Sequence, residues 1–111
     1  MPPGYDFVTH SLLPDSGMDA LLEGGLATLH QDGSWCLAVV AGSRNVTFIA
    51  WPENFKLVLS DDGKFEVHGD GKVLRQGEVV RLGGGEVTAG IRHSTEGACE
   101  SSHYFAVQSL P

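Results

Sequence analysis

The chain has few basic residues, with seven Lys and Arg against 14 Asp and Glu and a formal net charge of -7. The seven are scattered singly, so the sequence holds no basic cluster that would attract phosphate backbones or anionic lipid headgroups. It also holds no apolar run close to the roughly 20 residues that a membrane-spanning helix needs. We therefore expect no nucleic-acid partner and no membrane insertion.

Cysteine and aromatic residues are also scarce, at two cysteines and 8% aromatics in 111 residues. This length is typical of one domain with a modest core. Residues 1–17 lack the basic start and uninterrupted apolar segment of a signal peptide. The sequence therefore leaves the cellular compartment open.

Glycine is abundant at 15 residues, and three of the glycines directly follow an aspartate. Asp-Gly pairs supply the positive φ angles that tight hairpin turns need, so each pair predicts a reversal from one strand into the next. This role explains the aspartates without an active site. The predicted turn-forming residues are Asp32, Gly33, Asp62, Gly63, Asp70 and Gly71.

Between these turns, short apolar runs show the period of two that is typical of strands, as with Phe55, Leu57 and Leu59 on one face. We count seven or eight such runs and no helix-length segment between them. The pattern predicts an all-β fold, a small antiparallel β-barrel of meander or OB-like type, with a β-sandwich as the alternative. Pro52 predicts a corner, and the glycines at 83–85 predict a bulge or loop.

The N-terminal 22 residues differ from the rest in being rich in proline and poor in strand pattern. We predict a flexible arm over residues 1–22, in which Tyr5, Phe7 and Val8 are candidate contacts with the domain. A weak capping pattern at 16–19 predicts one helical turn that ends at Leu22. Residues 23–111 are predicted to form the single barrel domain.

The two cysteines, Cys36 and Cys99, allow one intramolecular disulfide. A loop of about 60 residues closed in this way contributes about 4 kcal/mol in the chain-entropy treatment. Two free thiols are the alternative. A catalytic thiol is disfavoured because the apolar strand around Cys36 would raise its pKa.

Five histidines raise the question of a metal site, but none has the spacing of a metal-binding motif. Motifs for serine hydrolases, dinucleotide sites and phosphate loops are also missing from the sequence. We therefore predict no catalytic residues, no metal and no cofactor. The competing hypothesis is a metal-dependent hydrolase or metal-binding domain that uses His93 and His103 with Glu96 or Glu100.

Aromatic residues at strand ends are the candidates for ligand or partner contacts. Trp51 and Pro52 follow a predicted strand, and Tyr104 begins the last one beside His103. Core packing is the alternative role for the aromatic rings. Together with the loops expected at 51–54, 83–86 and 92–103, these four residues predict binding at one barrel end.

Three segments carry a resemblance to a known group of proteins: Trp35-Cys36-Leu37, the Ile49-Ala50-Trp51-Pro52 stretch, and the glycine-rich run that ends at Gly85, followed by Cys99. Over about residues 23–110 the chain resembles small β domains of uncharacterised bacterial exported proteins and lipoproteins. The resemblance implies a bonded Cys36–Cys99 pair and, through it, an extracytoplasmic location. It implies no catalytic residues.

These observations favour a non-enzymatic module that binds a protein or a small ligand. The alternatives are the metal-dependent enzyme and a structural or assembly subunit that forms homo-oligomers.

Overall fold

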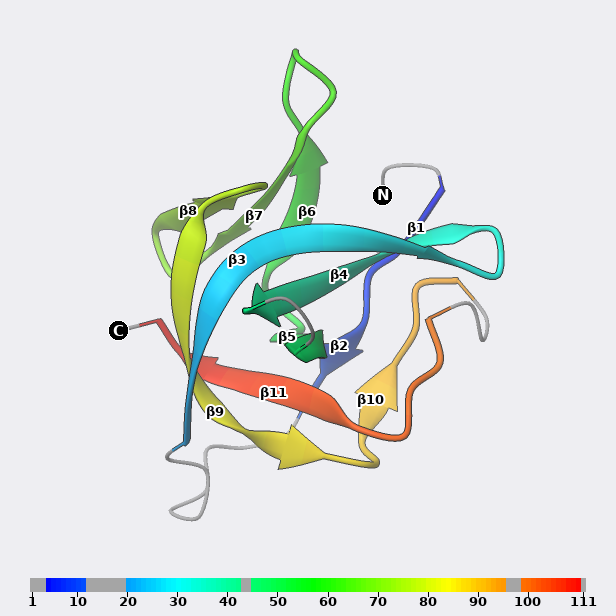
Figure 1. Cartoon of the computed structure of the whole chain (residues 1–111), viewed down its shortest axis with the longest axis vertical. Coiled ribbons are helices and arrows are strands. Elements are labelled where there is room, and N and C mark those ends of the chain that lie inside the picture. Colours follow the sequence, from blue (N-terminus) through cyan, green and yellow to red (C-terminus); the bar gives the residue numbers. More distant parts are fainter. Residues whose placement is uncertain (1–3, 12–19, 43–44, 96–98, 111) are drawn as a thin grey trace.

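Eleven strands make up the part of the chain that this computed structural model describes, residues 4–11, 20–42, 45–95 and 99–110 (Figure 1). No helix in these residues is long and apolar enough to cross a membrane. The strands are β1 (Tyr5–Asp6), β2 (Thr9–His10), β3 (Ala20–Gln31), β4 (Ser34–Ala41), β5 (Asn45–Pro52), β6 (Lys56–Leu59), β7 (Phe65–Gly69), β8 (Lys72–Arg75), β9 (Val79–Val87), β10 (Ile91–Arg92) and β11 (Tyr104–Ser109).

The five long strands close into a barrel in the order β3–β4–β5–β11–β9, with β9 paired back to β3. The predicted all-β barrel is therefore confirmed. Four of the five pairings are antiparallel, but β11 runs parallel to β5. That parallel pairing differs from the purely antiparallel barrel we expected, because β11 arrives from a distant part of the chain.

Hairpin turns occur at all three Asp-Gly pairs. Asp32 and Gly33 have φ angles of 49° and 81° between β3 and β4, and Asp70 and Gly71 have 51° and 72° between β7 and β8. Two consecutive positive φ angles are the geometry that matches the twist of a two-residue hairpin. Gly63, at 82°, lies in the longer turn between β6 and β7.

The glycines at 83–85 lie inside the continuous strand β9, so the expected loop at 83–86 is wrong. A Cβ atom added to Gly84 would collide with the backbone oxygen of Ala106 on β11. Close approach of two strands, rather than a bend, is the reason for glycine here. The register shift falls on β11, between Val107 and Ser109.

The N-terminal segment is part of the barrel wall, unlike the flexible arm that we predicted. β4 and β5 pair with each other only where residues 38–41 lie beside residues 45–48. Beyond these residues the two strands separate, and residues 4–10 lie between them. β1 pairs with β4, while β2 pairs with β5 and β10. Strands of two residues have no measurable period, which is why they could not be predicted from the residue pattern.

The predicted helical turn is also absent from those of its residues that the structure describes. Residues 12–19 lie outside the described part, and 20–22 begin strand β3. Gly24 and Gly25, which follow the predicted turn, also lie within β3. Gly24 is needed there, because an added Cβ would come within 2.6 Å of the Val40 carbonyl oxygen.

Two apolar clusters lie on opposite sides of the wall formed by β4, β5 and β11. Inside the barrel, Leu26, Val39, Ile49 and Leu82 are among the residues that form the main core. Outside it, the smaller cluster is Val8, Cys36, Ala50, Cys99 and Tyr104.

The part of the chain between β5 and β9 forms a separate three-stranded sheet, β6–β7–β8. Phe65 and Val67 on β7 join the main barrel core, together with Phe55 and Leu57. The turn between β6 and β7 projects away from the barrel (Figure 1). This sheet carries its charged side chains outward, where they border the site described next.

Candidate functional site

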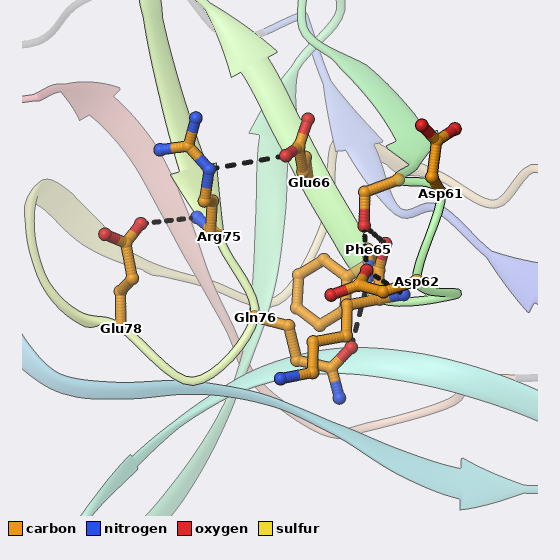
Figure 2. A pocket seen from close by; sticks show the side chains of 9 residues that line it. Asp61, Asp62, Phe65, Glu66, Arg75, Gln76 and Glu78 are labelled. Atoms are coloured by element: carbon orange, nitrogen blue, oxygen red, sulfur yellow. Dashed lines mark hydrogen bonds and ion pairs between the residues drawn. The ribbon is translucent and has the colours of Figure 1, made fainter.

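A hollow of about 510 Å³ lies at one end of the β6–β8 sheet, between the β6–β7 turn and the segment that joins β8 to β9 (Figure 2). Its size is within the range of ordinary ligand sites. The lining residues are Ser60, Asp61, Asp62, Lys64, Phe65, Glu66, Arg75, Gln76 and Glu78.

Phe65 and Gln76 hold the two sides of this hollow together. The Phe65 amide donates to the Gln76 side-chain oxygen at 3.1 Å, and the Gln76 amide donates to the Phe65 carbonyl at 3.1 Å. The Phe65 side chain is fully buried in the core. The hollow therefore rests on a fixed base.

Charged groups surround that base. Glu66 Oε2 lies 3.3 Å from Arg75 Nε, and Glu66 Oε1 lies 2.9 Å from Nε2 of His68 outside the hollow. Glu78 accepts a hydrogen bond from the backbone amide of Arg75 at 2.8 Å. Four carboxylates and two cations line the hollow, so its formal charge is negative by two.

The turn between β6 and β7 contributes two of the carboxylates. Asp62 accepts hydrogen bonds from the Ser60 hydroxyl and the Lys64 amide, and the Ser60 bond is the main reason that its pKa is lowered. Asp61 has no hydrogen bond or ion pair to any described residue and extends away from Phe65 (Figure 2). It is the carboxylate most available to a ligand.

The four predicted contact residues do not form one site. Trp51 is fully buried, with its ring centroid 6.4 Å from that of Phe7 and 6.0 Å from that of Phe55. Its expected place at the barrel mouth is wrong, because it shares the inward face of β5 with Ile49. Pro52 lines a different hollow, of about 380 Å³.

Tyr104 is also buried, and it holds the last loop in place. Its hydroxyl donates to the Cys99 carbonyl at 2.5 Å and accepts from the Ser101 amide at 2.9 Å. Burial raises the pKa of Tyr104. His103 instead lies on the surface, with Nδ1 3.0 Å from Glu86.

The two histidines of the metal hypothesis have different carboxylate partners. His93 Nδ1 lies 2.7 Å from Asp6, whereas His103 pairs with Glu86. Within the described ranges, no three His, Cys, Asp or Glu side chains are placed to hold a metal ion. Glu96 lies outside those ranges.

Asp6 is the important polar residue that the sequence did not reveal. It is almost completely buried, and it accepts backbone hydrogen bonds from Thr95 at 3.0 Å and Cys99 at 2.9 Å. Cys99 is bonded to Cys36, the register partner of Asp6 on β4. Asp6 and the disulfide thus fix residues 93–95 and Cys99 to the barrel wall.

Comparison with known protein families, curated proteins and solved structures finds no match to this chain. The functional inference consequently depends on the geometry above.

Proposed function

We propose that the protein is a non-enzymatic binding module whose ligand, a positively charged small molecule or a basic segment of a partner protein, occupies the hollow beside β7 and β8. The single observation behind this proposal is the hollow of about 510 Å³, which combines a fixed base with an excess of carboxylates over cations. The acidic balance of the whole chain adds a field that concentrates cations near such a site.

We further propose that the barrel is OB-like. Numbered by order along the chain, its five strands close as first, second, third, fifth and fourth, with the third and fifth parallel. The β6–β8 sheet occupies the connection between the third and fourth strands, where an OB-fold carries a helix. Ligands of OB-folds bind on the face of the second and third strands.

Part of that usual binding face is covered in this chain. The second and third barrel strands are β4 and β5, and their outer side packs against Val8, Cys99 and Tyr104. Val8 of the N-terminal segment and Cys99 therefore take the place of a ligand over part of that face. This supports a ligand site elsewhere, at the β6–β8 sheet.

The disulfide supports a proposed location outside the cytoplasm, because structural disulfides persist mainly in oxidising compartments. The catalytic alternative has less support. His93 and His103 are engaged by separate carboxylates, and no observation favours a reaction at either one.

The test is a titration of isotope-labelled protein with two short capped peptides, Gly-Lys-Gly-Lys-Gly and Gly-Glu-Gly-Glu-Gly, followed by NMR. We expect the lysine peptide to shift amides at 60–66 and 75–78 and the glutamate peptide to leave them unchanged. Asp61→Asn and Glu78→Gln should weaken the response. Glu53→Gln, which neutralises an exposed carboxylate that does not line the hollow, is the matched control.

Two results would overturn the proposal. One is the absence of shifts at the hollow with the lysine peptide. The other is equal weakening by Glu53→Gln, which would indicate attraction to the overall negative charge rather than to a site.

A further inference from the structure

The outer face of the β3–β9 pair carries a regular arrangement of three cross-strand pairs, which we call the β3–β9 face. In register, Leu21 lies opposite Gly83, Glu23 opposite Arg81, and Gly25 opposite Val79. The residues that alternate with them, such as Leu26 and Leu82, point into the core. These six side-chain positions therefore face outward together.

The face is apolar and unusually exposed at its two ends. Val79 is 74% exposed and Leu21 is 52% exposed. Val40 on β4 is the register partner of Gly25, and Val46 on β5 is the register partner of Val40. Val46 is 45% exposed. No described element covers these side chains, although burial of each would be favourable in free energy.

Each of the three pairs can pack against the same pair of a second copy in which the two strands have exchanged places. Two pairs join a large apolar residue with a glycine, and the third joins an acid with a base, Arg81 Nε being 3.1 Å from Glu23 Oε2. Stacked sheet faces lie about 10 Å apart, so residues of a second sheet can interdigitate with this one.

A two-fold axis parallel to the two strands and midway between them exchanges β3 with β9 in a second copy stacked on the face. Leu21 of one copy then lies over Gly83 of the other, and Val79 lies over Gly25. At the central position, Glu23 of each copy faces Arg81 of the other. A closed two-fold interface requires this kind of self-complementarity.

The glycine positions are open to different degrees. A Cβ placed on Gly25 would find only the Val40 carbonyl oxygen, at 3.9 Å, so this position is a notch able to receive Val79. At Gly83 the Ser109 hydroxyl already occupies the space that a Cβ would take, so this position offers no notch for Leu21. The Val79–Gly25 contact is therefore the main apolar contact in this arrangement.

The neutral charge of the β3–β9 face also favours a second copy of this chain as its binding partner. Two chains of net charge -7 repel each other, which opposes association through their acidic surfaces. The β3–β9 face has one acid and one base, so its six positions carry no net charge.

We propose that the β3–β9 face is an isologous interface between two copies of this chain. Three cross-strand pairs form a small contact, so we expect weak association, with a Kd in the range of about 10 µM to 1 mM. Added salt should leave the association unchanged or strengthen it, because it screens the repulsion between acidic chains. This proposal does not depend on the ligand hollow.

Sedimentation equilibrium over that concentration range tests the proposal. The native chain should approach twice the mass of one chain, and Val79→Asp should remain monomeric. Val73→Asp is the matched control, because Val73 is an exposed strand valine on β8, outside the face. Circular dichroism and thermal unfolding check that each variant is folded.

Charge reversal gives a test that folding effects cannot imitate. E23R and R81E should each be monomeric, because every copy would place like charges against the other. A mixture of the two should form a heterodimer, since the reversed side chains face each other and native Glu23 faces native Arg81. A monomeric native chain at 1 mM, dissociation by Val73→Asp, or failure of the mixture to associate would each overturn the proposal.

Discussion

Replacement of Asp6 by asparagine should destabilise the fold more than any other isosteric change at a carboxylate among the described residues. Asp6 is 1% exposed, and its two oxygens accept from several donors at once. One oxygen accepts from the Thr95 amide, and the other from the Cys99 amide and His93 Nδ1. An asparagine side chain has only one acceptor oxygen, and its NH2 group must face donors on the other side.

The magnitude follows from which donors lose their acceptor. In the better orientation the Thr95 amide and the more distant Ser94 hydroxyl lose their acceptor; the hydroxyl can rotate, so the Thr95 amide is the donor left unpaired, and an unsatisfied buried donor costs about 1–3 kcal/mol. The remaining bonds, to Cys99 and His93, also lose the strength that an ionised acceptor gives them. We expect a loss of about 2–4 kcal/mol, a large part of the 5–15 kcal/mol that is typical of a small domain.

Urea unfolding of the disulfide-bonded protein, followed by the fluorescence of buried Trp51, measures this loss. Asp61→Asn is the matched control, since Asp61 is exposed and has no partner among the described residues, and it should change stability by less than about 0.5 kcal/mol. Asp6→Asn should also increase the exchange rates of the Thr95 and Cys99 amides. A change below about 0.5 kcal/mol for Asp6→Asn would refute the assignment of Asp6 as the anchor of residues 93–95 and Cys99.

Two further predictions concern the disulfide and the β6–β7 turn. Cys36→Ala/Cys99→Ala, which opens a loop with a sequence separation of 63, should lower stability by about 4 kcal/mol in urea unfolding, and a loss below about 1 kcal/mol would contradict it. The Asp62 pKa is lowered by the Ser60 hydroxyl, so its contribution is present above the model-compound value of 3.8 and is lost as pH falls through its folded pKa. NMR titration should place the Asp62 midpoint below 3.8 and Ser60→Ala should raise it; a midpoint at or above 3.8 would be inconsistent with this hydrogen bond.

Features that depend on neighbouring residues could be predicted from the sequence. The Asp-Gly pairs at 32–33 and 70–71 form turns with positive φ angles, because the pair itself favours that backbone geometry. The alternation of apolar residues in 55–59 and 65–67 correctly indicates paired strands, and Phe55, Leu57, Phe65 and Val67 reach the core as expected, whereas Leu59 is exposed. Local chemistry determines these features, so a single sequence contains their signal.

Features that depend on distant pairing could not be predicted. The parallel contact of β11 with β5 and the insertion of residues 4–10 between β4 and β5 join segments far apart in the chain. The glycines at 83–85 suggested a bulge or a loop; the register shift beside them falls on β11, and Gly84 itself serves the close approach of that strand. The burial of Trp51 could not be predicted for the same reason, because the residues that pack against it include Phe7 from the N-terminal segment.

The covered wall explains why the candidate site lay outside the predicted residues. Tyr104 and the Cys36–Cys99 disulfide hold residues 99–103 against β4 and β5, so they cover part of the barrel face that would otherwise be open to a ligand. The hollow lies instead at the β6–β8 sheet, whose turn and charged residues were predicted only as hairpin structure. If the wall is covered for this reason, removal of the disulfide should loosen residues 99–103 without changing the hollow. The lysine peptide should then shift the amides at 60–66 in the Cys36→Ala/Cys99→Ala protein as it does in the native chain, provided the variant is folded.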